Sequence, residues 1–116
     1  QLKKMNKIEL NLPPEKLIII SIALQSVYNT KAHSRRHKAT LSIAYEVAAK
    51  LDSKVAGMKT KMQSLFDSKK KIKISLKFYE ADMLELLLID QIQYADNDFI
   101  RQQIQSVINV LNQKLA

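Results

Sequence analysis

The sequence predicts a single, mainly α-helical domain with a two-stranded antiparallel β-ribbon. Two short segments alternate apolar and polar residues with the period of a half-buried strand. Each is followed by two stretches with the apolar spacing of a helix. A chain of 116 residues can bury one hydrophobic core without disulfide or metal staples. We therefore expect a duplicated strand-helix-helix (β-α-α) unit, with an internal pseudo-two-fold.

The first predicted strand covers residues 7–12. Its apolar and polar positions alternate, as Ile8, Leu10 and Leu12 against Lys7, Glu9 and Asn11. Pro13 ends it because proline cannot donate to a ladder, and Pro14 and Glu15 suit the first turn of a helix. This helix should run to about Tyr28, although its isoleucine-rich stretch is also compatible with a buried strand.

A basic loop over residues 29–38 should lead into a second helix that begins near Ser34. Apolar residues then repeat at heptad spacing, at Leu41, Ala44, Ala48, Leu51, Val55, Met58, Met62 and Leu65. One helix over residues 38–66 would be about 43 Å long, which is longer than a globule of this size is wide. It should therefore either protrude or break near Asp52–Ser53 or Gly57.

The pattern restarts after a lysine-rich segment. Residues 72–77 again alternate, with Ile72, Ile74 and Leu76 on one face and Lys73, Ser75 and Lys77 on the other. A helix from about Tyr79 to Tyr94 is apolar on most sides and should lie near the centre of the fold. Asn97 or Asp96 should cap a last helix, which carries an apolar stripe of Ile100, Ile104, Val107, Ile108, Leu111 and Leu115.

The two halves align with each other, the strands at an offset of 64 positions and the helices after them at 66. A lone strand leaves unpaired backbone groups along both edges, so we expect the two strands to pair. We divide the domain into a first unit (residues 7–52), a helical basic connector (53–70) and a second unit (71–116). The open face of the ribbon should then carry Lys7, Glu9, Asn11, Lys71, Lys73 and Ser75.

Charge is distributed unevenly, with +12 over residues 1–77 and −4 over residues 78–116, for a net charge of +8. Such a field attracts nucleic acids, although many basic proteins carry only solvated lysines. The absence of cysteine excludes disulfides and thiolate metal sites and favours a reducing cytoplasm. The longest apolar run, residues 17–24, is too short for a membrane span, so no membrane association is expected. Glu9 and Glu15 precede it where a signal peptide has no carboxylates.

The arrangement resembles the ribbon-helix-helix family of DNA-binding proteins, in the tandem form that holds both units in one chain. The stretches IELNLPPEKL and IKISLKFYEADML resemble its strand-to-helix junction, and DNDFIRQQIQSVINVL resembles its second helix. The resemblance covers most of the chain. It implies sequence-specific binding of double-stranded DNA through a ribbon in the major groove. The process would be transcription regulation, or plasmid transfer by conjugation, plasmid partition or phage DNA processing.

The resemblance also implies roles for individual residues. The outward strand residues would read bases, namely Lys7, Glu9, Asn11, Lys71, Lys73 and Ser75. Lys can donate to guanine, Asn can pair bidentately with adenine, and a carboxylate can accept from cytosine. Phosphate contacts are implied at the starts of the second helices and around the ribbon, by Ser34, Arg35, Arg36, Lys38, Asn97, Lys69, Lys70 and Lys77. The sequence departs from the family at Asp96 and Asp98, which would repel phosphate, and in the absence of Gly from the turns between helices.

Other patterns have simpler explanations. His33 and His37 have the spacing of a two-histidine metal pair, but Arg35 and Arg36 oppose a cation, so neither a metal nor another cofactor is expected. The lysines of residues 69–77 could serve only to keep an exposed ribbon from aggregating.

The heptad helix suggests an alternative function. It could self-associate, although its lysines favour an acidic partner. That partner could be the helix carrying Glu80, either within this chain or on a neighbouring molecule. The alternative to DNA binding is thus a non-enzymatic helical module that binds an acidic protein. Enzyme activity is not expected, because the chain has no cysteine nucleophile, no Gly-rich phosphate loop and no interpretable Ser-His-acid set.

Overall fold

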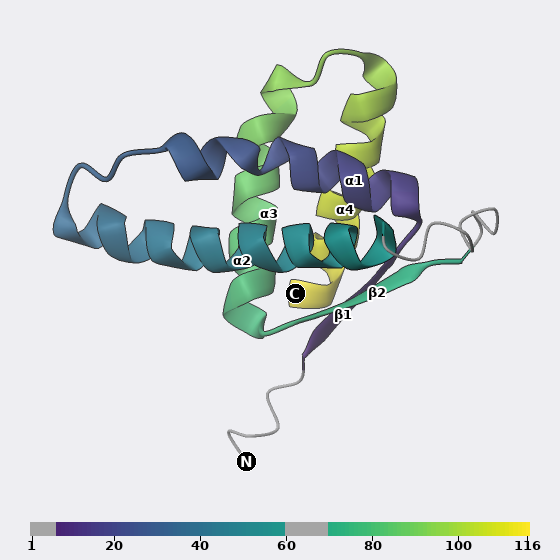
Figure 1. Ribbon diagram of the computed structural model, residues 1–116, viewed down its shortest axis with the longest axis horizontal. Helices are drawn as coiled ribbons and strands as arrows, with labels where there is room; N and C mark the ends of the chain where they lie inside the picture. Colours follow the sequence, from purple (N-terminus) through teal and green to yellow (C-terminus); the bar gives the residue numbers. More distant parts are fainter. Residues whose placement is uncertain (1–6, 60–69) are drawn as a thin grey trace.

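The structure, a computed structural model, describes residues 7–59 and 70–116 as four α-helices and one two-stranded sheet. The first half holds β1 (Ile8–Leu12), α1 (Pro14–Ala23), the 3-10 helix η2 (Gln25–Asn29) and α2 (Arg35–Lys59). The second half holds β2 (Ile72–Leu76), α3 (Phe78–Gln91), the 3-10 helix η4 (Ile92–Tyr94) and α4 (Asp98–Leu115). The predicted mainly helical chain with an antiparallel ribbon is confirmed (Figure 1).

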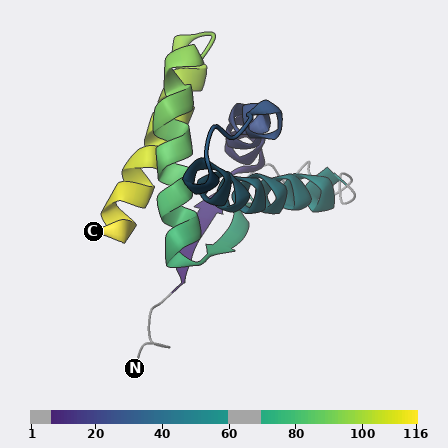
Figure 2. The same cartoon turned by 90° about the vertical axis from the view of Figure 1, so that its left-hand side faces the viewer.

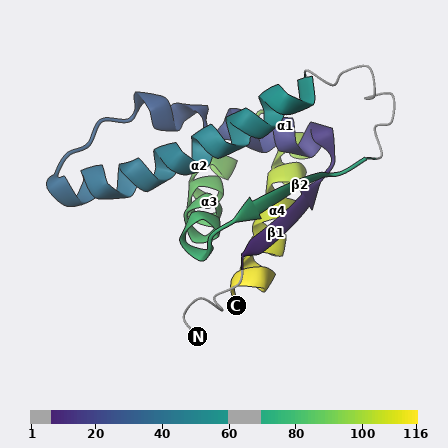
Figure 3. The same ribbon diagram turned by 60° about the horizontal axis from the view of Figure 1, so that its bottom comes forward.

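The two strands pair in the antiparallel direction with Leu10 opposite Ile74 at the centre. Both of these side chains are buried, whereas those of Glu9, Asn11 and Lys73 are exposed. Because neighbouring strand residues point to opposite faces, this register turns one apolar face inward and one polar face outward. Figure 3 shows the ribbon in front of α3 and α4, with its outer face turned away from them.

The helices form two hairpins that cross each other steeply. Figure 2 shows α3 and α4 on one side and α1 and α2 on the other, with the ribbon below α1 and α2 and beside the lower end of α3. The first helix of each hairpin packs on both helices of the other hairpin, since α1 contacts α3 and α4, and α3 contacts α1 and α2. A single core therefore joins the two hairpins. Its fully buried side chains come from every helix and both strands, and include Leu10, Leu17, Ile20, Val47, Leu51, Ile74, Leu84, Leu88, Val107 and Leu111.

The ends of the helices follow local signals in the sequence. The isoleucine-rich stretch of α1 is helical, so the alternative of a buried strand is wrong, and η2 extends it to Asn29. Asn97 caps α4, since its Oδ1 accepts from the backbone N–H of Ile100 at 2.9 Å. At the start of α2 the Oγ of Ser34 accepts from the backbone N–H of His37 at 3.1 Å. Both contacts satisfy donors that a helix leaves free at its first turn.

We expected the long helix either to protrude or to break near Asp52–Ser53 or Gly57, and no break occurs within the described residues. α2 continues through Asp52, Ser53 and Gly57 to Lys59, because Leu51 and Met58 are buried on either side of these weak helix formers. The predicted apolar positions Met62 and Leu65 lie outside the described residues, and the division into units at residues 52 and 70 stays a prediction. Figure 1 shows that the first turns of α2 extend past α3, so this helix protrudes at its start.

None of the helices within residues 7–59 and 70–116 has the length and apolar character required to cross a membrane.

Candidate nucleic-acid interface

The outer face of the ribbon is the surface on which the predicted base-reading residues meet. Glu9, Asn11 and Lys73 lie on its middle, exposed to solvent. Lys7 precedes β1 at one end, and Lys71 precedes β2 at the other, and both are exposed. The structure therefore brings five of the six predicted residues to one open face with lysines at both ends.

Two further predicted lysines flank this face. Lys77 follows β2 and lies at the same end as Lys7, because Ile8 and Leu76 are opposite each other in the ladder. Lys70 is exposed at the end where β2 begins. Lys69 lies outside the described residues. Both ends of the ribbon thus carry two exposed lysines, and lysine is a residue type that commonly contacts phosphates in DNA complexes.

The middle of the face holds an ion pair. Nζ of Lys73 lies 3.5 Å from Oε2 of Glu9, and the two side chains are 64% and 47% exposed. A pair this exposed contributes between about 0 and 1 kcal/mol, so an incoming base or phosphate can displace it at little cost. The pair also orients the long Lys73 side chain across the face towards β1.

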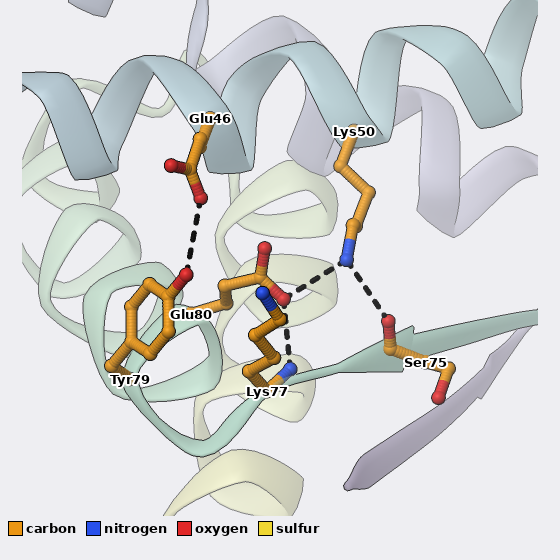
Figure 4. A network of polar contacts seen from close by, with 6 residues as sticks. All are labelled: Glu46, Lys50, Ser75, Lys77, Tyr79 and Glu80. Carbon is orange, nitrogen blue, oxygen red and sulfur yellow. Dashed lines mark hydrogen bonds and ion pairs between the residues drawn. The ribbon is translucent and has the colours of Figure 1, made fainter.

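The sixth predicted residue, Ser75, is half-buried and has a second role through its backbone. Its carbonyl oxygen accepts from Nζ of Lys50 on α2 at 3.3 Å. The same ammonium donates to Oε1 of Glu80 on α3 at 2.9 Å, and Oε1 also accepts from the backbone N–H of Lys77 at 2.8 Å. Figure 4 shows how Lys50 and Glu80 meet beside the end of β2. This network attaches the outer edge of the ribbon to two helices.

Glu80 is charged in this network at neutral pH. Its burial would raise the pKa of the carboxyl group, but the N–H of Lys77 and the ammonium of Lys50 outweigh burial and lower that pKa. The side chain is only 5% exposed, so the carboxylate compensates the charge of Lys50 inside the protein. Lys50 therefore supports the ribbon and is not free to bind a ligand.

The Lys50 network was not predicted as a site feature. Sequence patterns favoured an acidic partner for the long helix, and α2 does pack on α3 within the chain. A second contact joins them, because the hydroxyl of Tyr79 donates to Oε1 of Glu46 at 3.4 Å (Figure 4). The signal that could have located the network is the position of Glu80 three residues after Lys77, the spacing at which a glutamate bonds back to the start of its helix.

The predicted phosphate anchors at the second helices lie elsewhere. Arg35, Arg36 and Lys38 are exposed at the start of α2, at the far end of the α1–α2 hairpin (Figure 1). Asn97 begins α4 at the end of the α3–α4 hairpin, away from the ribbon (Figure 1). The structure does not bring these residues to the predicted base readers. The reason is that η2 and η4 lengthen the first helix of each hairpin, so the second helices begin far from the strands.

The start of α2 forms a basic tip, which we define as residues 31–38. The ion pairs found among the described residues involve none of its four cations, Lys31, Arg35, Arg36 and Lys38. The rings of His33 and His37 stack with their centroids 5.2 Å apart, and Nδ1 of His37 accepts from the backbone N–H of His33 at 3.0 Å. That bond occupies one of the nitrogens that a metal would use. Within the described ranges, no three His, Cys, Asp or Glu side chains gather as a metal site would require.

Taken together, the ribbon offers a charged, solvent-open face on a rigid support, and the tip offers positive charge on a protruding end. No family model, no curated protein and no solved structure matches the chain. The chemistry of these two surfaces is therefore the basis for a functional proposal. The ribbon alone combines cations with amide and carboxylate groups that can discriminate between bases.

Proposed function

We propose that the protein binds double-stranded DNA with the outer face of the β1–β2 ribbon in the major groove. The observation that carries this proposal is the antiparallel register, which exposes Glu9, Asn11 and Lys73 between two lysine-bearing ends. A two-stranded ribbon fits a major groove about 12 Å wide. Such a protein would act as a transcriptional regulator or as an accessory factor on plasmid or phage DNA.

The same register supports our proposal that the domain is a ribbon-helix-helix pseudo-dimer within one chain. Replacing each residue by its counterpart 64 positions away converts the pair Ile8–Leu76 into Leu12–Ile72 and leaves Leu10–Ile74 unchanged. A two-fold axis through the centre of the ribbon would require this pattern. The order of strand, helix, 3-10 helix and helix also occurs twice.

The two halves of such a ribbon would read different bases. Counterpart positions hold Glu9 and Lys73, and Asn11 and Ser75, so matching places in the groove meet unlike chemistry. A carboxylate favours the amino group of cytosine, whereas an ammonium favours the acceptors of guanine. The proposed target is therefore an imperfect palindrome, with half-sites that differ most where Glu9 and Lys73 face the bases.

The experiment that tests this function is selection of bound duplexes from a random pool, followed by titration of the selected site. Lys73→Ala should lose about 1–3 kcal/mol on that site and relax its preference at one base pair. Lys77→Ala should instead weaken binding to all duplexes alike and reduce the slope of log affinity against log salt by about 1.

Arg36→Ala serves as a matched control, since it removes one exposed cation far from the ribbon. It should leave affinity for the selected site unchanged. If Arg36→Ala weakens binding as much as Lys77→Ala does, the ribbon is not the principal contact. If Lys73→Ala and Lys77→Ala cause equal losses on every sequence, direct reading of bases by the ribbon is refuted.

A second candidate function is a non-enzymatic module that binds an acidic protein through the basic tip. It is favoured by the absence of any Asp or Glu between Glu15 and Glu46, which leaves the cations of the tip without local compensation. An acidic helical peptide that binds in an Arg36-dependent manner, together with no shift of any duplex at low salt, would support this candidate over DNA binding.

A further inference from the structure

Between Leu17 and Ala23, where only Ser21 is polar, apolar side chains extend from α1 in every direction, but they are covered on only part of the helix surface. Leu17 and Ile20 are fully buried in the core, whereas Ile22 is 65% exposed and Ile18 is half-buried. A helix that is hydrophobic on all sides normally has protein on all sides. We define Ile18 and Ile22, one turn apart, as the α1 ridge.

A groove lies directly beside the α1 ridge, between α1 and the start of α4. It consists of two adjoining cavities of about 650 and 230 Å³, which share Ile19 and Ile100 in their walls. Phe99 borders the larger cavity and is 48% exposed, and Tyr94 borders the smaller one and is 68% exposed. An exposed apolar ridge and a mainly apolar groove thus lie next to each other, the arrangement that a self-complementary contact requires.

Few charges lie around this groove. No residue between Lys16 and Lys31 is charged. The two cavities are lined by the carboxylates Glu15 and Asp96 and by no Lys, Arg or His. Two molecules of net charge +8 repel each other, but a contact through these cavities brings no cations of their walls together.

We propose that two copies of the chain associate through this face, with the α1 ridge of each copy entering the groove between α1 and α4 of the other. In a two-fold contact whose axis is perpendicular to α1 and level with residue 20, the two α1 helices run antiparallel side by side. Glu15 of one copy then faces Gln25 of the other, so the carboxylate meets an amide donor and no like charge. Every apolar side chain of the ridge and the groove becomes covered.

The proposal does not depend on DNA binding, because none of the ribbon residues assigned to base reading lines the groove. Self-association and DNA binding should also respond to salt in opposite ways. Added salt screens the repulsion between two basic chains and should strengthen self-association, whereas it weakens binding to a polyanion. Failure of either idea can therefore be recognised without reference to the other.

The test is sedimentation velocity of the whole chain, over roughly 5 to 200 µM and at low and high salt. We expect a species of twice the 13.3 kDa chain mass that increases with concentration. Ile22→Glu should raise the dissociation constant by at least about 100-fold, because the two-fold buries the new charge twice. Circular dichroism and thermal melting check that this exposed substitution leaves the fold intact.

Leu86→Glu is the matched control. Leu86 lies on α3, is 53% exposed and does not line the groove. This variant should associate as the unchanged protein does, and Lys73→Ala should as well. A monomer at every concentration and salt, an Ile22→Glu variant that remains dimeric, or equal dissociation of Ile22→Glu and Leu86→Glu would overturn the proposal.

Discussion

Removal of the Lys50 ammonium should destabilise the fold more than removal of the charge on its partner Glu80. Lys50→Ala leaves a carboxylate that is 5% exposed with only the Lys77 N–H as a partner, and it also deprives the Ser75 carbonyl of its donor. Glu80→Gln leaves instead an ammonium that is 34% exposed and can turn to water. The amide oxygen of the glutamine can still accept from Lys77.

The structure sets the size of each effect. Breaking a fully buried pair by removing one partner costs about 3–5 kcal/mol, and the partial exposure of Lys50 reduces this to about 2–3 kcal/mol. Glu80→Gln should cost about 1 kcal/mol, the value of one charge-assisted hydrogen bond in a partly solvated site. At about 4 °C per kcal/mol for a domain of this size, the melting temperature should fall by about 8–12 °C and about 4 °C, respectively.

The dependence on pH provides a second measurement of the same network. The folded pKa of Glu80 is lower than its ordinary value of 4.5, so its contribution to stability is present above pH 4.5 and is lost as the pH falls through the folded pKa. The unchanged protein should therefore lose stability below about pH 4.5 more steeply than Glu80→Gln does. Lys50→Ala should also lose stability less steeply at low pH, because burial of Glu80 disfavours its charged form and the Lys50 ammonium no longer offsets that effect.

Urea unfolding followed by circular dichroism at several pH values measures both effects, provided that the slope with denaturant stays constant. Lys54→Ala is the control, since Lys54 is an exposed lysine one turn further along α2, and it should change stability by less than about 0.5 kcal/mol. A loss from Glu80→Gln as large as that from Lys50→Ala would show that the buried carboxylate is not the costly group. If both variants lose stability at low pH as steeply as the unchanged protein does, Glu80 is already protonated in the folded protein at neutral pH.

Two further predictions concern polar contacts that fix the helices. Asp52 accepts from Ser21 and Tyr28 at 2.7 Å each and from Gln25 at 2.9 Å. The hydrogen bond from Tyr28, together with burial and the charge of Asp52, raises the pKa of Tyr28 to about 12. Asp52→Asn should lower the pKa of one of the four tyrosines towards 10 in an ultraviolet titration. It should also remove a contribution to stability that the unchanged protein keeps up to about pH 10 and loses as the pH rises through about 12. Asn97→Ala should cost about 1 kcal/mol in urea unfolding by removing the cap of α4, whereas Asn97→Asp, which keeps the accepting oxygen, should remain within about 0.5 kcal/mol of the unchanged protein.

Alternation was sufficient to predict the ribbon, because a period of two residues directly determines which side chains share a face. Ile8, Leu10 and Leu12 could have faced only one way once they were paired with the second alternating segment. The cap at Asn97 was equally local, since its side chain bonds within its own first turn. The alternation within each strand and the cap of α4 depend on residues within five positions of one another, and such features can be predicted from sequence. The pairing of Leu10 with Ile74, 64 positions away, followed instead from the unpaired backbone edges of two lone strands.

Features that depend on distant residues could not be predicted in the same way. The sequence left open whether the long helix protrudes or breaks near Asp52–Ser53 or Gly57. It continues to Lys59 because Asp52 is held by Ser21, Gln25 and Tyr28 from the preceding helices. These contacts, which span 24 to 31 positions, stabilise the helix where its own propensity is weak. The placement of Arg35 and Arg36 failed for a related reason, since one 3-10 segment before the loop moves the start of α2 away from the ribbon.

Among the described residues, the cations considered above lie in three separate places. Lys50 is neutralised inside the protein, the ribbon presents Lys7, Lys71 and Lys73 outward, and the basic tip lies at the end of a hairpin. A straight duplex held by the ribbon alone would neutralise about four phosphates, so log affinity should fall by roughly 3–4 for each unit of log salt. A much steeper slope would mean that the tip also contacts DNA, which requires either a bent duplex or a second molecule of the protein on the same site.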